Sequence, residues 1–482
     1  MKNFQNQLRV YPVPKGALLQ RDFLLRVRPE GGEWQSVPIF QVKVDMHDVR
    51  EASMAYFDFS GHVEVEITFP RFYTVYQALI HPLSLKITPT IDPKRVTFML
   101  NCPVNLAVEI NKDRFHNLHL FSCPMEEAPD KDAPNMLVVK GSLEHDCFLS
   151  DDINQKLSEM PEGRTLYIEP GMYHIGEFLW HLPSHTNIYL EGGAILKGGL
   201  VCEHAQDIHI RGRGMIYQAH FERFSGTNGL RLSHSRNICV ENLMFLNPPH
   251  YTVYAGDSED IILRGIRTFS CEGWSDGLDF MSCRRVLIED CFLRTSDDCI
   301  AVYASRWDNR GDSRDFTVRR TCHWADVAHP RMIGTHGACD TEGDVIEDLL
   351  YEDLDILEHH EFQPGYLGAM AINAGDKNTV RHVTFRNIRI EPFEHGKLLD
   401  VQVKCNPDYN PAPGKRIEDV TFEKIFLLTG SGEEPSEIAG YSPEFTVENI
   451  TIRELYRDGK RVKSLEEANI QVGQYVHGTT LI

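Results

Sequence analysis

The chain has 482 residues, of which 42% are hydrophobic and 25% charged, and its formal net charge at pH 7 is −21. This composition is typical of a globular chain long enough for two domains or one large repeat array. The acidic balance disfavours nucleic acid and anionic membrane surfaces as partners, and no stretch approaches the roughly 20 consecutive apolar residues of a membrane span.

The first thirty residues contain neither a long apolar run nor a small-residue cleavage pattern. No secretory signal is visible, so we expect a cytoplasmic protein. The twelve cysteines are scattered without any CxxC pair, which favours reduced core thiols over a disulfide scaffold. The sequence leaves the oligomeric state open, and a homo-oligomer is possible.

Residues 1–150 are predicted to form an antiparallel β-sandwich that packs beside, or positions substrate for, the rest of the chain. Period-two alternation at this spacing is typical of short antiparallel strands. The runs are HVEVEITF (62–69), SLKITPT (84–90), RVTFMLN (95–101) and NLAVEIN (105–111). The charged, Pro-bearing segment MEEAPDKDAP (125–134) indicates a loop or strap near the boundary.

From about residue 163 the sequence repeats a unit of two short apolar runs joined by a polar or small turn residue. Copies include NIYLEGGAIL (187–196), DIHIRGRGMI (207–216), NICVENLMF (237–245), DIILRGIRTF (260–269), RVLIEDCFL (285–293), HVTFRNIRI (382–390), DVTFEKIFL (419–427) and NITIRELY (449–456). A single copy cannot bury its own apolar face, so the copies must stack. No amphipathic helical pattern separates them, which argues against a βαβ barrel.

We therefore predict an all-β protein whose residues 151–482 form a right-handed parallel β-helix, with coils stacked about 4.8 Å apart. The polar residues from about 460 are expected to cover the open end of the solenoid.

The stretch between Trp274 and Ser305 holds Asp276, Asp279, Asp297 and Asp298. Ionised carboxylates crowd together at a free-energy cost unless the crowding is used, so this stretch is a site candidate. Asp276 and Asp298 are separated by 22 residues, close to one coil, and should stand on the same outer face. Adjacent aspartates in a strand point to opposite sides, so a local bend is needed for both to face one groove.

Three carboxylates in a cleft suit inverting glycoside hydrolysis. In that reaction a protonated acid meets the leaving oxygen while a carboxylate base activates water on the other side of the sugar. Crowding raises one carboxyl pKa enough to keep the necessary proton near neutral pH.

The segment GWSDGLDFMSCRRVLIEDCFLRTSDDCIAVY (273–303) resembles the core of the polygalacturonase family of glycoside hydrolases. Members of that family carry four sequence motifs, the NTDG, DDC, GHG and RIK blocks, on a parallel β-helix. The resemblance covers roughly residues 163–460. It implies that Asp297 is the general acid, that Asp276 and Asp298 activate water, and that Asp279 is structural. LNPPHYTVY (246–254), which contains His250, is similar to the segment below the cleft in that family.

Two blocks depart from the family pattern. The GHG block is best matched by AHPRMIGT (328–335), which makes His329 the cleft histidine, and His336 is the rival assignment. The preceding insertion WDNRGDSRDF (307–316) could overhang the groove. The RIK block should fall within MAINAGDKN (370–378), where Asn373 is a candidate contact but no Arg or Lys stands at the matching place.

Loss of these basic side chains removes the charge-assisted pairing that a uronate carboxylate needs, so a neutral glycan is expected. Lys404, in DVQVKCN (400–406), could fill the basic role instead and restore a uronate substrate. The front domain and the run DDCIAVYASR also resemble, more loosely, the dextranase and isopullulanase family, which acts on neutral α-glucans. Trp274 and Tyr303 flank the acids and could stack on sugar rings or belong to the core.

The sequence thus predicts an inverting glycoside hydrolase acting on a plant- or microbe-derived oligosaccharide or polysaccharide, α-glucan-like rather than uronate, with no cofactor and no metal. HHE (359–361) and the nearby His336, Cys339 and Asp340 lack the regular spacing of a zinc site.

A polygalacturonase or exo-galacturonidase acting on pectic oligosaccharides is the alternative within the same class. A polysaccharide lyase would need a base beside a uronate, and a non-catalytic carbohydrate-binding solenoid would need no paired acids. The sequence does not name the sugar. Exo or endo attack depends on the insertions at 307–316 and 359–368.

Overall fold

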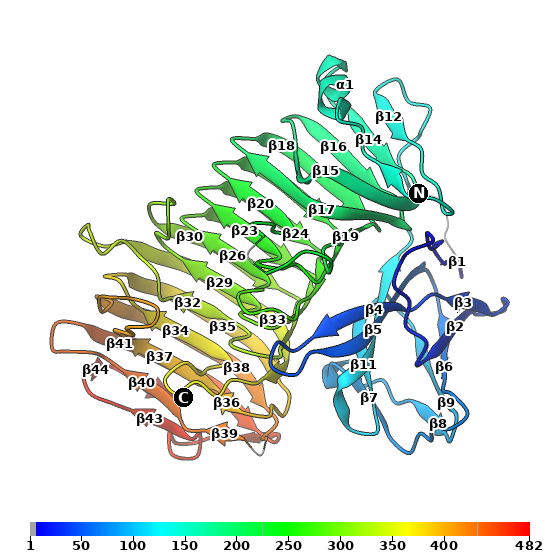
Figure 1. Ribbon diagram of the computed structural model, residues 1–482. Helices are drawn as coiled ribbons and strands as arrows, with labels where there is room; N and C mark the ends of the chain where they lie inside the picture. Colours follow the sequence, from blue (N-terminus) through cyan, green and yellow to red (C-terminus); the bar gives the residue numbers. More distant parts are fainter. Residues whose placement is uncertain (1–5, 224, 431) are drawn as a thin grey trace.

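The computed structural model describes residues 6–223, 225–430 and 432–482 (Figure 1). The chain forms a two-sheet N-terminal sandwich and one long solenoid of parallel strands that pair continuously from β12 to β45. The predicted fold class, a parallel β-helix preceded by a β-sandwich, is confirmed. Within the described residues, no helix is long and apolar enough to cross a membrane.

The sandwich consists of two sheets, ordered β1-β5-β11-β10-β7, with β4 on β5, and β3-β2-β6-β9-β8. Its apolar core lies between them. Its strands are β1 (Leu8–Arg9), β2 (Leu24–Pro29), β3 (Gln35–Val37), β4 (Phe40–Val44), β5 (Arg50–Phe59), β6 (Val63–Thr68), β7 (Ala78–His81), β8 (Thr90–Asp92), β9 (Arg95–Leu100), β10 (Asn105–Ile110) and β11 (Asp113–Pro124).

Two details of this sandwich differ from the predicted pattern. The strands β5 and β11 pair in parallel, whereas the other pairs are antiparallel. The run 84–90 does not form one strand: a 3₁₀ turn at Leu83–Leu85 ends at Lys86 in the left-handed conformation, with φ 54°, and a strand begins only at Thr90. Pro82 precedes this run and Pro89 lies within it, and proline lacks the N–H that a strand ladder requires.

The solenoid begins with β12, whose parallel pairing to β14 starts at Met136, and α1 (Ile153–Glu159) lies at its N-terminal end (Figure 1). Its first strands are β12 (Met136–Val139), β13 (Cys147–Phe148), β14 (Thr165–Ile168), β15 (Gly171–His181), β16 (Thr186–Leu190), β17 (Ala194–Glu203), β18 (Gln206–Gly212), β19 (Met215–Tyr217), β20 (Leu230–Ser233), β21 (Arg236–Glu241), β22 (Met244–Leu246), β23 (Val253–Gly256), β24 (Glu259–Arg264) and β25 (Arg267–Phe269).

The central coils, which carry the acids, contain β26 (Leu278–Met281), β27 (Arg284–Glu289), β28 (Phe292–Thr295), β29 (Ile300–Tyr303), β30 (Ser313–Arg319), β31 (Cys322–Ala325), β32 (Met332–Gly334), β33 (Val345–His359), β34 (Met370–Ala374) and β35 (Thr379–Ile390). The last coils contain β36 (Gly396–Lys397), β37 (Leu399–Val403), β38 (Arg416–Leu427), β39 (Glu433–Glu434), β40 (Ser436–Ala439), β41 (Thr446–Arg457), β42 (Lys460–Arg461), β43 (Ile470–Val472), β44 (Val476–His477) and β45 (Thr480–Leu481).

The turn residues inside each repeat adopt the left-handed conformation that bends the chain into a coil. Asn242, Gly265 and Asp290 have φ of 61°, 62° and 59° at successive bends. Asn, Asp and Gly tolerate this region best, which explains why the repeat carries them there. Asp353 and Asn387 form the same bend within the longer strands β33 and β35.

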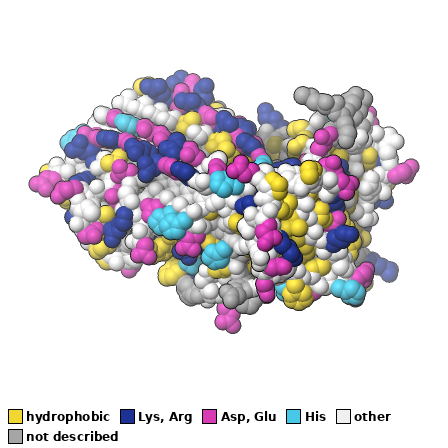
Figure 2. All heavy atoms as spheres, turned by 90° about the horizontal axis from the view of Figure 1, so that it is seen from above, with side chains coloured by type: hydrophobic (Ala, Val, Ile, Leu, Met, Phe, Trp, Pro, Cys, Tyr) yellow, Lys and Arg dark blue, Asp and Glu magenta, His cyan; other side chains and the backbone are white. Residues whose placement is uncertain are grey.

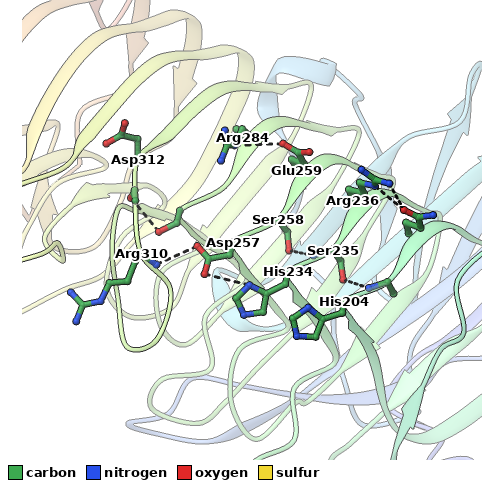
Figure 3. Close-up of a pocket in the computed structure, with 14 residues that line it drawn as sticks. His204, His234, Ser235, Arg236, Asp257, Ser258, Glu259, Arg284, Arg310 and Asp312 are labelled. Carbon is green, nitrogen blue, oxygen red and sulfur yellow. Dashed lines mark hydrogen bonds and ion pairs between the residues drawn. The ribbon is translucent and has the colours of Figure 1, made fainter.

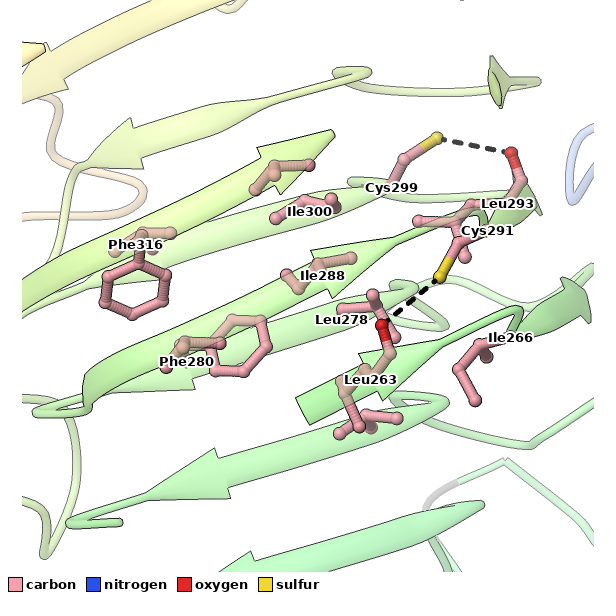
Figure 4. Packing of buried hydrophobic residues seen from close by; sticks show 14 of the residues in the cluster. Leu263, Ile266, Leu278, Phe280, Ile288, Cys291, Leu293, Cys299, Ile300 and Phe316 are labelled. Atoms are coloured by element: carbon pink, nitrogen blue, oxygen red, sulfur yellow. Dashed lines mark hydrogen bonds between the residues drawn. The ribbon is translucent and has the colours of Figure 1, made fainter. Parts of the chain in front are cut away.

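Apolar side chains fill the inside of the solenoid, and each stacks on the equivalent side chain of the next coil. Leu263 lies in register with Ile288, and the Phe280 and Phe316 rings meet edge to face at 5.4 Å (Figure 4). The buried thiol of Cys291 donates to the carbonyl of Leu263 (Figure 4). This stacking holds the strands that carry the site in fixed register.

An outer face of the solenoid carries a column of alternating charge, here called the charge ladder. In strand register it reads Arg211, Glu241, Arg264, Glu289, Arg319, Glu352, Arg386, Glu423 and Arg453. The Arg264 and Arg319 guanidiniums both reach the Glu289 carboxylate at 2.7 Å. Basic and acidic side chains intermingle on the surface in the same way when it is seen from above (Figure 2).

The sandwich lies beside the solenoid and packs on it through an apolar layer (Figure 1). Phe121 of β11 contacts the rings of Phe269 and Phe292 at 5.9 and 5.2 Å. Fully buried Arg294 donates to Asp326 at 2.9 Å and to Asn117 of the sandwich at 2.7 Å. The sandwich therefore covers the face of the solenoid formed by β19, β22, β25, β28 and β31. It does not cover the strands that follow the acids.

Candidate active site

The side chains of Asp276, Asp298 and His329 stand one above another. Each lies just before a strand, and the three strands belong to successive coils. The N–H of Gly277 donates to the Asp298 carbonyl at 2.8 Å, and the N–H of Cys299 donates to the His329 carbonyl at 2.8 Å. These bonds align Asp276, Asp298 and His329 at the starts of β26, β29 and β32. We call β23, β26, β29, β32, β34 and β37 the cleft strands.

Asp297 joins this row because residues 296–298 form a bend rather than a strand. The bend lets two adjacent aspartates face one site. One carboxylate oxygen from each of Asp276, Asp297 and Asp298 lies within 4.8 Å of the other two. The predicted gathering of these carboxylates is therefore present in the structure.

The Asp297 carboxyl has the surroundings of a proton donor. Its Oδ2 accepts from the N–H of Trp274 at 2.9 Å, and its Oδ1 accepts from the N–H of Asp298 at 3.0 Å. These two N–H donors favour the ionised carboxylate, but burial, followed by the charge of Asp298, outweighs them and raises the pKa of Asp297 to about 7. A large share of this carboxyl is thus protonated near neutral pH, as general acid catalysis requires.

The Asp298 carboxylate is held by His329. Its Oδ1 accepts from the backbone N–H of His329 at 3.0 Å and lies 2.7 Å from the ring Nδ1. The hydroxyl of Tyr303 lies 3.4 Å from Oδ2. His336 instead packs its ring against Tyr303 at 4.9 Å, and burial lowers its pKa well below 6.5. Of the two candidate histidines, His329 is the one bonded to a clustered acid.

Asp276 and Asp279 form a second close pair of carboxyls. Burial and the charge of Asp279 raise the pKa of Asp276 well above its usual range, and burial raises that of Asp279. Within the described residues, the oxygens of fully buried Asp279 have no hydrogen-bond partner other than the carboxyl of Asp276. Asp279, expected to be structural, therefore belongs to the same electrostatic cluster as the other three acids.

Arg306 is a basic residue of the site that sequence reasoning missed. Its Nη1 donates to the hydroxyl of Tyr251 at 2.7 Å, and its guanidinium carbon lies 4.8 Å from the Tyr303 ring centre. Its charge opposes the burial that raises the pKa of Asp279. Its position follows from the turn after β29, which folds back over the cleft strands. The sequence signal was only an Arg directly before the insertion 307–316.

Aromatic side chains surround the acids. Trp274, whose N–H binds Asp297, is 54% exposed and lies 6.3 Å from the His250 ring. His250 in turn meets Tyr251 at 4.3 Å, and burial lowers its pKa to about 4. The structure thus places His250, Trp274 and Tyr303 together around the acids.

Lys404 and Asn373 are bonded within the chain. Lys404 Nζ donates to Asp400 Oδ2 at 2.6 Å, to the Gly365 carbonyl at 2.6 Å and to Asn373 Oδ1 at 3.2 Å. An ammonium has three N–H donors, so all three have acceptors in the chain. The Asn373 amide donates to Asp400 at 3.0 Å. Lys404 in this geometry has no donor left for a sugar carboxylate.

Oxygen ligands from Asp276, Asp297 and Asp298 are close enough to hold a cation. The raised pKa values of Asp276 and Asp297 oppose this, because a protonated carboxyl is a poor ligand. Two other groups with ligand atoms close together, His209–Cys239–Glu241 and Glu347–Asp348–His382, lie on outer surfaces and contain ion pairs. The absence of a metal stays a prediction.

A separate pocket of about 440 Å³ lies at the opposite ends of the cleft strands (Figure 3). His204 and His234 stack there at 4.8 Å, and His234 lies 3.5 Å from Asp257 (Figure 3). Its ionisable groups pair largely with one another, and we assign it no function.

A parallel β-helix that presents clustered aspartates at the starts of neighbouring strands is typical of β-helical glycoside hydrolases. The sequence model of Glycosyl hydrolases family 28 matches residues 219–471, slightly more than half of the chain. The chain belongs to this family, which confirms the resemblance inferred from the SDG and SDDC blocks.

Sequence relatives support the same family. A polygalacturonase from Juniperus ashei is 24% identical over 265 residues, covering 54% of this chain and 48% of that protein. A probable polygalacturonase from Arabidopsis thaliana is 23% identical over 281 residues, covering 57% of this chain and 56% of that protein. The chain spans about half the length of the curated relatives it matches.

Two solved structures show the fold over most of the chain. Dex49A from Penicillium minioluteum superposes with a TM-score of 0.61 at 12% identity, covering 100% of this chain and 97% of that one. The Family 28 exopolygalacturonase of Yersinia enterocolitica gives 0.52 at 12% identity, covering 86% and 96%. The first likeness includes the N-terminal sandwich.

Proposed function

We propose that this protein hydrolyses O-glycosidic bonds in an oligosaccharide or polysaccharide, with Asp297 as the general acid. The observation that carries the proposal is the Asp297 carboxyl, whose pKa is raised to about 7 beside two further carboxyls. A non-catalytic solenoid has no use for this arrangement, because burying several carboxyls together costs free energy.

In the proposed reaction the Asp297 proton passes to the glycosidic oxygen as the bond to the anomeric carbon breaks. A water molecule attacks that carbon and gives up a proton to Asp298, while Asp276, whose raised pKa favours its protonated form, helps to orient that water. Asp298, fixed by both donors of His329, is the better oriented acceptor. Each turnover consumes one water and returns the proton to Asp297 through solvent.

We propose inversion at the anomeric carbon on the basis of the family resemblance. The nearest oxygens of the three acids lie within 4.8 Å, closer than the roughly 6.5–9.5 Å between carboxyl groups that is usual for inversion, so spacing alone does not predict the outcome. NMR of the first anomer released decides this point. A retained configuration would instead assign one acid as a nucleophile.

For the substrate, we propose a uronate-containing glycan of the pectic type. The expected neutral glycan followed from the absence of an RIK block, but Arg306 supplies a guanidinium beside the acids, and relatives named polygalacturonase match the chain. Guanidinium groups pair with carboxylates through two parallel hydrogen bonds. A neutral glycan is the second candidate, because Lys404 is already saturated by its partners in the chain.

The test is the release of reducing ends by the wild type, by Asp297→Asn and by Asp132→Asn, whose carboxylate is exposed. The glycans are polygalacturonate, neutral α- and β-glucans and fructans. Hydrolysis of polygalacturonate that Asp297→Asn loses and Asp132→Asn keeps supports the proposal. Hydrolysis of neutral glycans alone would contradict the substrate assignment, and an unsaturated product would indicate elimination by a lyase.

A further inference from the structure

The outward-facing side chains of the cleft strands near the acids are buried. In a groove open along the whole solenoid, these side chains would be exposed. Seven residues on or just before these strands form an apolar cluster with exposures from 0% to 9%: Tyr251, Tyr254, Met281, Ala301, Tyr303, Met332 and Ala371. We call these seven side chains the floor of the site, and other segments of the chain must cover parts of it.

The first cover is the segment 306–310, which follows β29 and is here called the rim segment. Its Trp307 ring stacks on Tyr254 at 6.0 Å with 13° between planes, and on Tyr251 at 6.1 Å. Arg306 lies against the same Trp307 ring, with its guanidinium carbon 4.3 Å from the ring centre. Trp307 remains 52% exposed, so one side of the indole faces outward.

The rim segment is fastened to the coil two turns earlier. The Asn309 amide donates to the hydroxyl of Tyr254 at 2.6 Å, and the N–H of Arg310 donates to Asp257 at 3.2 Å. A Cβ at Gly256 would stand 2.0 Å from Asn309 Oδ1. Because Gly256 has no side chain, the rim segment can lie directly on β23.

The second cover comes from the other direction along the solenoid axis. The Tyr366 ring meets His329 edge to face at 4.2 Å and stacks on Tyr409 at 4.7 Å. The Tyr409 hydroxyl donates to Gln363 at 2.7 Å, and Lys404 donates to the Gly365 carbonyl at 2.6 Å. Lys404 therefore helps to hold this cover in place.

The acids lie between the two covers. Tyr251, Asp276, Asp298 and His329 occupy successive coils, so the two aromatic walls are separated by about three coil spacings, on the order of 14 Å. Asp276 and Asp298 are only 3% and 1% exposed. A long sugar chain lying along the floor would meet Trp307 on one side and Tyr366 on the other.

We propose that the active site is a closed-ended pocket that admits one end of the sugar chain, and that Trp307 and Tyr366 make the protein an exo-acting hydrolase. This inference rests on the proposed glycosidase function and specifies which bonds are attacked. The chain end enters past the half-exposed rings of Trp274 and Trp307, and bonds far from the end cannot reach Asp297.

The test follows the purified full chain on polygalacturonate and on each neutral glycan that it hydrolyses. Viscosity and product sizes are measured together during the first few per cent of bond cleavage. The pocket predicts that mono- or disaccharide dominates from the start while viscosity falls little. A spread of intermediate oligosaccharides with a steep early loss of viscosity overturns the pocket and leaves the hydrolase function standing.

Variants then test the two walls. Trp307→Ala and Tyr366→Ala should raise the share of intermediate oligosaccharides several-fold, whereas Trp307→Phe and Phe72→Ala, at a fully exposed sandwich site, should not. Thermal melting of each variant shows whether it remains folded. An unchanged product pattern in folded Trp307→Ala and Tyr366→Ala would contradict the assigned role of both walls. Hydrolysis of no glycan at all would overturn the proposed function and this inference together.

Discussion

The carboxylate of Asp298 accepts from the backbone N–H of His329 at 3.0 Å and lies 2.7 Å from the Nδ1 of the same residue. One residue thus fixes the acid twice, through main chain and side chain, across neighbouring coils. Removing the imidazole leaves the backbone N–H as the remaining donor to Oδ1 and the more distant Tyr303 hydroxyl near Oδ2.

We expect His329→Ala to lower kcat by about 10- to 100-fold with a much smaller change in KM, because a hydrogen bond to a charged group contributes about 1.5–3 kcal/mol. Steady-state kinetics on the best substrate measures both constants. His336→Ala is the matched comparison, since that ring packs on Tyr303. A larger loss of kcat in His336→Ala would reverse the assignment of the cleft histidine.

The rate should depend on pH through Asp297. With its pKa raised to about 7, the acid form that donates the proton is lost above that pH. We expect kcat/KM to fall by about tenfold for each further pH unit on the alkaline side. A profile that stays flat to pH 9 would exclude Asp297 as the group that must be protonated.

The same shift affects folding stability. The Asp297 pKa is raised to about 7 in the folded chain, compared with about 3.9 for an unfolded aspartate, so its favourable contribution is complete below about pH 3.9 and is lost as pH rises through about 7. Asp297→Asn should therefore melt a few degrees higher than the wild type at pH 8, with a smaller gain at pH 5. Calorimetry at both values checks this, with Asp132→Asn as control. A gain that shrinks from pH 5 to pH 8 would show the opposite shift.

Arg306 should separate charged from neutral substrates. If its guanidinium receives a uronate carboxylate, Arg306→Ala should raise KM for polygalacturonate by about tenfold or more, and Arg306→Lys should restore only part of the affinity. Initial rates over a concentration series provide the constants. An equal loss on a neutral oligosaccharide would assign Arg306 to holding Tyr251 in place.

Chelation should leave the activity intact. The three clustered aspartates have cation-ligand geometry, but the raised pKa values of Asp276 and Asp297 favour protons over metal. We expect full activity after dialysis against EDTA, with calcium and magnesium additions changing the rate by less than twofold. Loss of activity that a divalent cation restores would contradict the metal-free prediction.

The solenoid was predictable because its information is local and repeated. Each copy carries its own apolar alternation and its own turn residue, such as Asn242 or Asp290, so many weak signals agree. The spacing of Asp276 and Asp298 then followed from the coil length. Sequence reasoning failed where a single segment decides the conformation, as at 84–90, where Lys86 and Pro89 break an apparently alternating run.

The covered site could not be predicted in the same way. Arg306 and Trp307 lie near the acids only because their turn folds back and Asn309 finds Tyr254 beside Gly256. No periodic pattern marks such contacts, since they join one insertion to one strand. The complete burial of Asp279 was not predicted for a related reason: it depends on neighbouring coils, where Tyr254 and Ala301 lie in register with it, and its structural role stays a prediction.

The charge ladder also sets how the solenoid can lengthen. Arg and Glu alternate at every coil from Arg211 to Arg453. If a coil paired with the next coil but one, instead of with its neighbour, residues of equal charge would lie opposite each other. A duplication of one coil would create a like-charged neighbour pair at the junction, whereas a duplication of two coils would continue the alternation. In this face of the molecule, the coil pair is therefore the unit by which the chain can be extended without electrostatic penalty.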